Sequence, residues 1–542
     1  MRKYLYGIGM AVLMAAFTSC SNTPSSAGLL PDDAVVVVRM DVKQIAEKSA
    51  LSDNQEIKEQ IKTWLKDADL KKRTSDKILS IIDDPAEMGL DLRDPLFLAV
   101  PADEEQTRLV GSVYDSEKLT DFLDIMAKEG DLDKVDTYDD LSGMALGSNL
   151  AIVFDDKCFM VVGKDYDDDF KDVAKDVLDV FSGKAKSDLL EDKDFAEMCS
   201  RDGVMQLLFR GEGLDKIRDF KEISKSFPDG CEMEDIAYLL DIEANLGELV
   251  MKCEYLANSK EWKEWIANTA SSMGEIKGEF TDLVSRKYAA VFGNFDGELL
   301  LKTINEMDLM DDLDKDERRI FENMLTAIKG DFALGFNQVD MVDDDNQFVF
   351  YAQSKNNDLV DALKDINSNG ELEELGKNAY SWKETSPWGV DSVEESSLRM
   401  LFGIKNGNTY CCTSTNDEPK TFDKPRGAFD KSDIKGKGLY GFLNFAQFDY
   451  FGYYSEVYEV LAKYLDFAEV YIEEDGCSVM RVAIKNKNKN PLEIIYSMTA
   501  DIIGAFDEWL YLDENYAEEP APVDDEDDYA VEAAPVDDHD LY

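Results

Sequence analysis

Cys20 is the side chain in this sequence whose position predicts a definite covalent chemistry. It follows two cations, Arg2 and Lys3, then the mostly apolar run Tyr4–Phe17 of 14 residues, and a Thr-Ser pair. A positive start, a short apolar run and small residues before a cut site form the pattern of a secretory signal, and the run is short for a bilayer span. The thiol of Cys20 then stands at the cut, where it can accept a lipid.

This stretch resembles a bacterial lipoprotein signal, with residues 16–20, Ala-Phe-Thr-Ser-Cys, in the place of the lipobox. The resemblance implies that residues 1–19 are a signal peptide, that Cys20 is acylated, and that residues 20–30 form a lipidated tether, flexible over Ser21–Ala27. Each buried methylene adds about 0.8 kcal/mol of membrane affinity, so several chains anchor a protein permanently. The alternatives are an ordinary secretory signal with an incidental cysteine, or a single membrane anchor.

Other side chains that carry chemistry are scarce. The one histidine is His539, near the C-terminus, so the body holds no Ser-His-Asp or Cys-His arrangement and no histidine-based metal site. The seven further cysteines form no C-x-x-C pair, which argues against redox motifs and zinc ribbons. We expect mostly buried free thiols, with one or two disulfides as the alternative; these cysteines are Cys158, Cys199, Cys231, Cys253, Cys411, Cys412 and Cys477.

Acidic clusters are the remaining candidates for chemistry. Asp312, Asp314 and Asp316 have the spacing of a calcium loop, but Glu317 replaces the required glycine and Asn323 replaces the bidentate glutamate. The segment is better explained as an acidic helix N-terminus. Paired carboxylates can hydrolyse glycosides without histidine, but no local motif selects a pair among 115 acids. We therefore expect no catalytic residue, no metal site and no cofactor, and the ligand-binding residues stay unassigned.

Aromatic residues give a weaker signal. The aromatic-rich segment 445–464 has helical spacing typical of a core face, with a sugar- or peptide-binding face as the alternative. Trp262 and Trp265 share one helix face and are predicted to be buried. Trp382 and Trp388 flank a proline in a predicted loop, where they could stack on a ligand.

The elements that must position these residues follow one order, strand, helix, strand, strand, helix, which occurs four times. The expected strands are 34–40, 95–100 and 107–115; 203–210, 237–244 and 248–256; 288–295, 331–337 and 347–353; and 438–444, 468–473 and 477–485. Additional hairpins are expected at 143–163 and at 399–414, the second turning on Asn406-Gly407. The fold class is α+β, with antiparallel sheets and helices packed on one face.

These matches align residues 31–273 with residues 284–510, which predicts a tandem duplication of one α+β half; chance alternation is the alternative. Residues 511–542 carry 13 acids and no Lys or Arg, so we expect an acidic disordered tail. The whole chain of 542 residues has a net charge of −57, which argues against a nucleic-acid partner.

The segment Leu29–Asp41, LLPDDAVVVVRMD, resembles the opening of a large Bacteroidetes lipoprotein family catalogued as a domain of unknown function. Asp41 at its end is suited to cap the helix that follows. The resemblance implies an outer-membrane lipoprotein of the Gram-negative cell envelope and no activity. No acidic residue follows Cys20 before Asp32, whereas surface-export signals in such bacteria place acids soon after the cysteine, so we expect the periplasmic face in preference to the cell surface. We expect a non-catalytic binding or scaffolding role with an envelope protein or glycan as partner. An envelope hydrolase with paired carboxylates and a cation-responsive binding module are the alternatives.

Overall fold

The computed structural model describes most of the body of the chain. The described residues are 24–50, 58–59, 61–63, 65, 70–102, 107–130, 132–163, 169–184, 187–214, 227–306, 310, 313–338, 347–366, 371–383, 399–414, 425, 427–447, 455–473, 476–495, 497–499 and 501–502. Cys20, His539 and the predicted tail at 511–542 lie outside them. Within these residues no helix has the length and apolar composition that a bilayer crossing requires.

The strands occur in two sets along the chain. The first set is β1 (Ala34–Met40), β2 (Leu90–Asp91), β3 (Leu96–Pro101), β4 (Arg108–Val113), β5 (Asp136–Tyr138), β6 (Leu141–Ala145), β7 (Leu150–Phe154), β8 (Cys158–Gly163), β9 (Met205–Arg210), β10 (Ile236–Asn245) and β11 (Glu248–Ala257). The second set is β12 (Ala289–Asp296), β13 (Ile328–Gln338), β14 (Gln347–Ser354), β15 (Glu371–Gly376), β16 (Ala379–Lys383), β17 (Arg399–Lys405), β18 (Asn408–Ser414), β19 (Leu439–Asn444), β20 (Leu465–Ile472) and β21 (Ser478–Ile484).

Helices connect these strands. They are α2 (Val42–Ser49), α4 (Lys72–Asp83), α5 (Ser116–Gly130), α6 (Phe170–Phe181), α7 (Lys193–Ser200), α9 (Lys260–Ser272), α10 (Gly297–Glu306), α11 (Lys315–Ala327), α12 (Asp358–Asp365), α13 (Lys431–Ile434) and α14 (Ser455–Tyr464). The 3₁₀ helices are η1 (Ser25–Leu29), η2 (Pro85–Met88), η3 (Asp188–Glu191), η6 (Met233–Asp235), η7 (Thr281–Leu283) and η9 (Phe445–Gln447). Asp41 caps α2 as expected, because its Oδ1 accepts a hydrogen bond from the Gln44 amide at 2.9 Å.

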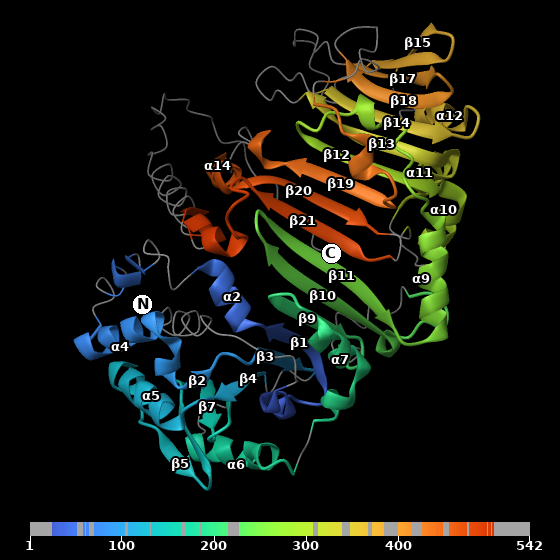
Figure 1. The fold of residues 1–542 in the computed structure, drawn as a ribbon. Helices are drawn as coiled ribbons and strands as arrows, with labels where there is room; N and C mark the ends of the chain where they lie inside the picture. The colour runs from blue at the N-terminus through green and yellow to red at the C-terminus, as the bar shows by residue number, and fades with distance from the viewer. Residues whose placement is uncertain are drawn as a thin grey trace, which may run out of the picture.

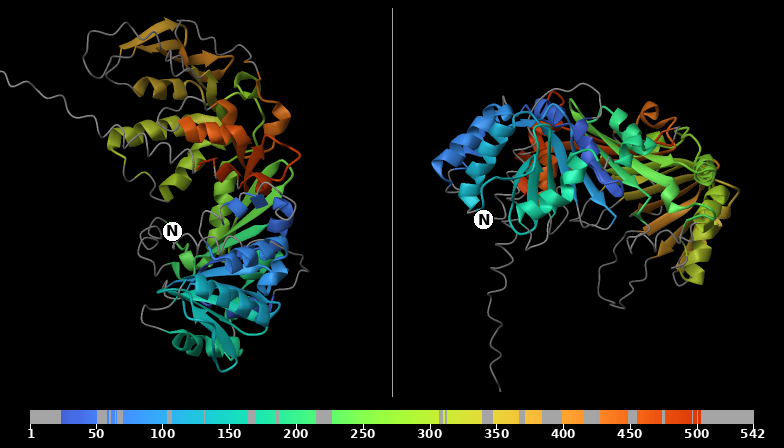
Figure 2. Two further views of the ribbon diagram at one scale, coloured as in Figure 1. Left: turned by 90° about the vertical axis from the view of Figure 1, so that its left-hand side faces the viewer. Right: turned by 90° about the horizontal axis from the view of Figure 1, so that it is seen from below.

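All strands join one antiparallel, twisted sheet (Figures 1 and 2). The order from one edge is β5, β6, β7, β8, β4, β3, β1, β9, β10, β11, followed by β21, β20, β19, β12, β13, β14, β18, β17, β16, β15, with β2 beside β4. Among the described strands, β5 and β15 are each paired on one side only, so the sheet is open.

The two sets of strands have the same order, read outward from the contact between β11 and β21. In each set a long hairpin lies at the centre, and β9 or β19 follows, then the first strand of the set (β1 or β12). A second pair (β3 and β4, or β13 and β14) comes next, and a four-stranded meander forms the outer edge. The sequence predicted each of the long strands, and the Asn406-Gly407 turn is confirmed by positive φ angles of 55° and 84° at the two residues.

Helices cover both faces of the sheet, which corrects the expectation of one covered face. On β8, Met160 packs with α6 and α7, whereas its neighbour Phe159 packs with α5 on the opposite side. The reason is visible in Leu150–Phe154 and Cys158–Val162, which are continuous apolar runs and not alternating patterns, as expected for strands buried on both faces.

The second part of the predicted tether is folded. Ser25–Leu29 forms η1, and Ala27, Leu29 and Leu30 are buried in the same core as α6. The Ser-rich composition suggested a flexible linker, but the apolar Ala27–Leu30 segment can bury its surface against β4 and β8, and this burial outweighs the composition. The described part of the chain therefore becomes compact five residues after Cys20.

Candidate functional site

The central strands of the sheet carry an uncharged row of side chains on one face. Residues that pair directly across strands point to the same face. One such row runs over eleven strands without a charged side chain: Leu96, Met40, Met205, Ile242, Met251, Met480, Val470, Gly441, Val291, Leu334 and Phe350. We call the side of the sheet that carries this row the apolar face.

Within the described residues, the apolar face is left uncovered between β9 and β13. Six of its large side chains are 37–46% exposed: Phe209, Tyr238, Tyr255, Met480, Val470 and Phe336. Eight strands at a spacing of about 4.8 Å make this uncovered stretch about 34 Å long. A contiguous exposed apolar surface of this extent is typical of a site that binds another molecule.

A hollow of about 270 Å³ lies on this face, above β12, β13, β19, β20 and β21. We call it the central hollow, and its lining includes Val291, Phe336, Leu443, Val470 and Met480. Glu469 also borders it, but the Glu469 side chain belongs to the opposite face, where it pairs with Arg481 at 3.5 Å and Arg286 at 3.4 Å. The side chains that enter the central hollow are therefore apolar.

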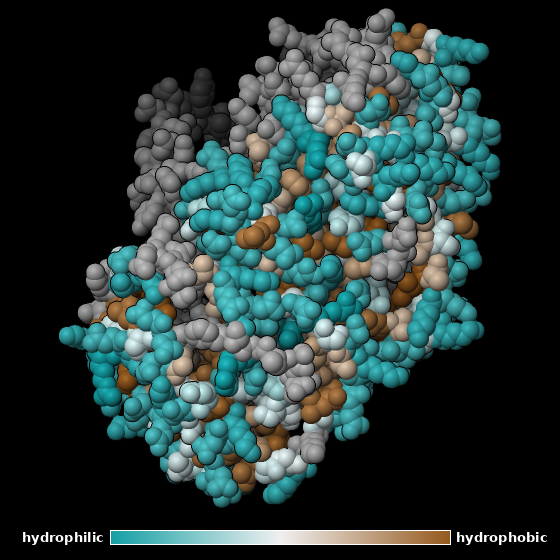
Figure 3. Space-filling view, in the orientation of Figure 1, coloured by the Kyte–Doolittle hydropathy of each residue, from teal (hydrophilic) through white to brown (hydrophobic). Residues whose placement is uncertain are grey.

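On the opposite face of the same strands, ion pairs gather around the β11–β21 contact, whereas Leu208, Phe292 and Phe442 belong to two buried cores. Lys252 pairs with Glu243 at 2.6 Å, and Arg481 pairs with Glu248 at 2.5 Å across the β11–β21 contact. Seen from the side of the molecule that carries α7, hydrophilic residues cover most of the central surface (Figure 3). The opposite face is therefore part core and part ion-paired surface, whereas the apolar face carries no ion pair among these strands.

A second hollow, of about 410 Å³, lies between α9 and the end of the β20–β21 hairpin; we call it the side hollow. It adjoins the central hollow, because Ile472 in its lining stands two residues from Val470 on the same face of β20. Tyr255 and Trp265 supply aromatic surface, and Glu275 and Glu473 supply carboxylates. The Trp265 Nε1 and Thr269 Oγ1 atoms are buried and have no hydrogen-bond partner within the described residues.

Tyr255 is held in place by a second tyrosine. The rings of Tyr238 and Tyr255 lie 4.4 Å apart, on neighbouring strands of the apolar face. Burial, followed by the hydrogen bond with Tyr255, raises the pKa of Tyr238 above its ordinary value. The Tyr238 phenol therefore stays neutral at physiological pH and adds no charge to the apolar face.

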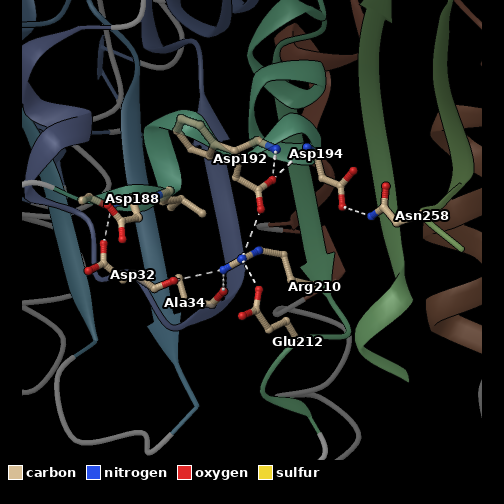
Figure 4. A network of polar contacts seen from close by, with 11 residues as sticks. Asp32, Ala34, Asp188, Asp192, Asp194, Arg210, Glu212 and Asn258 are labelled. Carbon is tan, nitrogen blue, oxygen red and sulfur yellow. Dashed lines mark hydrogen bonds and ion pairs between the residues drawn. The ribbon is translucent and has the colours of Figure 1, made fainter. Parts of the chain in front are cut away.

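Buried Arg210 is the centre of a clamp of structural contacts, not of a reactive cluster (Figure 4). The Arg210 guanidinium donates to the carbonyl oxygens of Asp32 and Ala34 at 3.1 and 3.0 Å. It also donates to the carboxylates of Asp192 at 3.1 Å and Glu212 at 2.7 Å. The clamp ties the start of β1 to β9 and to the first turn of α7.

Neighbouring acids in Figure 4 are also engaged by structural partners. The other oxygen of Asp192 caps α7 by accepting from the amides of Asp194 and Phe195 at 2.8 and 2.9 Å. Asp194 accepts from Asn258 at 3.0 Å, and burial raises the pKa of Asp194. Sequence patterns gave no signal for this cluster, because its members come from separate segments.

The acidic segment singled out from the sequence acts as a helix cap where it is described. Asp314 and Glu317 form a reciprocal capping box at the start of α11, and Asp169 likewise caps α6. Asp312 lies outside the described residues. No group of three potential metal ligands occurs within the part of the chain that the structure covers.

The cysteines and tryptophans are placed as follows. The seven cysteines Cys158 to Cys477 are free thiols, and burial raises the pKa of Cys199 to about 11 and of Cys411 to about 12. Trp262 is buried as predicted. Trp382 is not in a loop but in β16, where it is buried and stacks on Phe402; Trp388 lies outside the described residues.

Comparison with known proteins gives a family but no activity. The family model described as "Domain of unknown function (DUF4836)" matches residues 27–492. This agrees with the expectation of a family without an assigned function. No curated protein matches. A solved structure described as "Structure of crystal form I of TP0453" is 13% identical and has a TM-score of 0.25, with 46% of this chain and 86% of that chain covered.

Proposed function

This chain belongs to the family of the domain of unknown function DUF4836, and from its geometry we propose that it is a non-catalytic, lipid-anchored protein of the Gram-negative cell envelope whose apolar face binds an acyl chain. The observation that carries this proposal is the uncharged row of side chains over eleven strands, uncovered where it meets the central hollow. The Bacteroidetes origin, the outer-membrane location and the periplasmic orientation belong to the same proposal.

An acyl chain suits this surface better than a peptide does. The strands that form the uncovered stretch are each hydrogen-bonded to a neighbour on both sides. They offer no free backbone groups to pair with an added strand, as peptide binding at a sheet edge requires. A linear ligand without polar groups needs only apolar contact, and the unbranched side chains of Met251 and Met480 at the centre can adapt to it.

The absence of a catalytic role is supported by what the buried charges do. The carboxylates around Arg210 bind a guanidinium and helix amides, so their role is structural.

We also propose that the two halves arose by tandem duplication, because the same strand order occurs on both sides of the β11–β21 contact. A duplicated half explains why the apolar row continues across that contact without a break.

Binding is tested with a fluorescent fatty acid and the variants Val470→Lys and Met480→Lys. Because both side chains are 39–46% exposed, lysine is tolerated by the fold, yet it places a charge on the apolar face. We expect each variant to bind the fatty acid at least tenfold more weakly, at an unchanged melting temperature. Leu246→Lys is the matched control, because Leu246 is 70% exposed in the β10–β11 turn.

Three outcomes speak against an acyl ligand. Equal binding by all variants would place the fatty acid elsewhere. If the wild type binds no fatty acid but self-associates in sedimentation, and Val470→Lys abolishes the association, a second copy covers the face. If neither occurs and Val470→Lys instead removes a specific crosslink to another envelope protein, the occupant is a protein.

Attachment to the membrane is tested with Cys20→Ala. The variant lacks the thiol that would carry the lipid, and we expect it to move completely from the membrane pellet to the soluble fraction of cells. Ser21→Ala is the neighbouring control and should stay in the pellet. Retention of Cys20→Ala in carbonate-washed membranes would contradict lipid anchoring.

A further inference from the structure

The last described residues of the chain lie next to a strand of the apolar face. Residues 491–495, 497–499 and 501–502 are helical and follow β21 after a turn. Asp501 fixes their end, because its Oδ2 atom accepts a hydrogen bond from Lys463 Nζ at 2.6 Å and from the Tyr464 hydroxyl at 2.8 Å. Tyr464 directly precedes β20. The chain therefore leaves the described structure at the end of a strand that lines the central hollow.

The residues that follow in the sequence are apolar in a helical pattern. Residues 503–510 lie outside the described residues, and their sequence is Ile-Gly-Ala-Phe-Asp-Glu-Trp-Leu; we call them the amphipathic segment. Ile502, Phe506 and Trp509 stand at positions i, i+4 and i+7, whereas Asp507 and Glu508 fall on the other side of a helix with this spacing. A pattern of this kind favours burial of the apolar side against a second apolar surface.

The length of the amphipathic segment matches the distance to the central hollow. Ala468 and Val470 line the hollow, and they are about 10 Å and about 17 Å along β20 from its first residue, Leu465. Eight residues span about 12 Å as a helix and at most about 28 Å when extended. Phe506 and Trp509 can therefore reach the hollow without movement of the described elements.

The central hollow suits an aromatic ring. Its volume of about 270 Å³ exceeds the roughly 150 Å³ of an apolar cavity that holds one benzene molecule. Burial of Phe506 and Trp509 against Val470 and Met480 would remove two apolar surfaces of one molecule from water. Because both surfaces belong to one chain, their contact costs less association entropy than the binding of a separate partner.

We propose that the amphipathic segment is an intramolecular competitor: Phe506 and Trp509 occupy the central hollow when no ligand is bound, and an acyl chain displaces them. This inference rests on the proposed function and adds regulation to the same site. The segment and the ligand use one surface, so the apparent affinity for the ligand is reduced by the fraction of molecules in which the hollow is free.

Displacement is tested with the fluorescent fatty acid and the full chain. Phe506→Glu and Trp509→Glu each place a charge on the apolar side of the amphipathic segment and alter no described residue. We expect each variant to bind the fatty acid at least fivefold more tightly than the wild type, a gain that unfolding cannot produce. Tyr529→Glu is the matched control, because it also replaces an aromatic ring by a carboxylate, and its affinity should equal that of the wild type.

A second measurement locates the amphipathic segment without any ligand. The photoreactive residue p-benzoylphenylalanine replaces Trp509 in the full chain. On irradiation we expect crosslinks to peptides of the same chain that contain Val470 or Met480, and a saturating fatty acid should reduce them at least fivefold. The same photoreactive residue in place of Tyr529 is the control and should give no crosslink to these peptides.

The outcomes separate this inference from the proposed function. Crosslinks only at other surfaces, or wild-type affinity in both glutamate variants, overturn the competitor, and the acyl site stands if the fatty acid binds. Crosslinks between labelled and unlabelled chains in an isotopic mixture mean that a second copy supplies the segment, which overturns the intramolecular contact. Crosslinks to Val470 or Met480 in a chain that binds no fatty acid, even as Phe506→Glu, overturn the proposed function and the displacement, because the segment is then a permanent cover.

Discussion

Replacement of Arg210 by Leu is expected to lower the free energy of unfolding by about 3 kcal/mol. The Arg210 side chain is 8% exposed, and its removal leaves the carboxylate of Asp192, which is 22% exposed, without its cation. Loss of one partner from a buried ion pair costs about 3–5 kcal/mol. We expect the lower end of this energy range, because Glu212, the second acid that pairs with Arg210, is 69% exposed and can be hydrated by solvent once the arginine is lost.

Denaturant unfolding of the chain without residues 1–20 measures this change. Arg319→Leu is the matched control, because Arg319 is 55% exposed and pairs only with the exposed acids Asp316 and Asp365. That control should change the free energy of unfolding by less than about 1 kcal/mol. Equal effects of the two substitutions would show that the clamp contributes no more than a surface pair.

Replacement of Asp331 by Asn is expected to cost about 2–4 kcal/mol. Asp331 in β13 is 1% exposed, and its carboxylate accepts from the backbone amides of Lys277 and Glu279 at 3.0 Å and from Asn294 at 2.6 Å. An asparagine side chain would turn an N–H group toward one of these donors. The substitution therefore loses charge-assisted bonds and leaves a buried donor unpaired, although the shape is nearly the same.

The control for this change is Asp179→Asn, since Asp179 is 68% exposed and pairs with an exposed lysine. The same unfolding measurement applies, and hydrogen exchange at residues 274–280 gives a local reading. We expect faster exchange there in Asp331→Asn, because this carboxylate holds the segment that connects the two strand sets. Unchanged exchange would mean that the segment is held by its other contacts.

Local elements could be predicted well from the sequence, and their assembly could not. The runs Ala34–Met40 and Leu465–Ile472 have apolar and β-branched residues that identify strands wherever they pair. Nothing in either run indicates that β1 lies between β3 and β9, or that β11 meets β21, because pairing over 200 residues depends on the whole fold. The alternation in β11 predicts two unlike faces but not which of them is covered.

The candidate site was missed for a related reason. Met480 and Val470 look like ordinary core residues in sequence, and only the complete sheet shows that they are 39% and 46% exposed. Trp265 was expected to be buried, and the structure finds it partly buried, with its ring packed against Trp262. The acidic segments drew attention by composition, yet they cap helices, which is the role that their spacing favours.

The contact between β11 and β21 has a consequence for biosynthesis. While the first half is synthesised ahead of the second, β11 is an edge strand with a row of unpaired amides and carbonyls, and it stays so until residues 478–483 arrive. Such an edge attracts other nascent chains. Glu248 and Lys252 then act as gatekeepers, because two charges on one side of a six-residue strand edge, with Glu254 directly beyond it, oppose stacking with a second copy. The charges that later form ion pairs in the finished sheet thus protect the unfinished one.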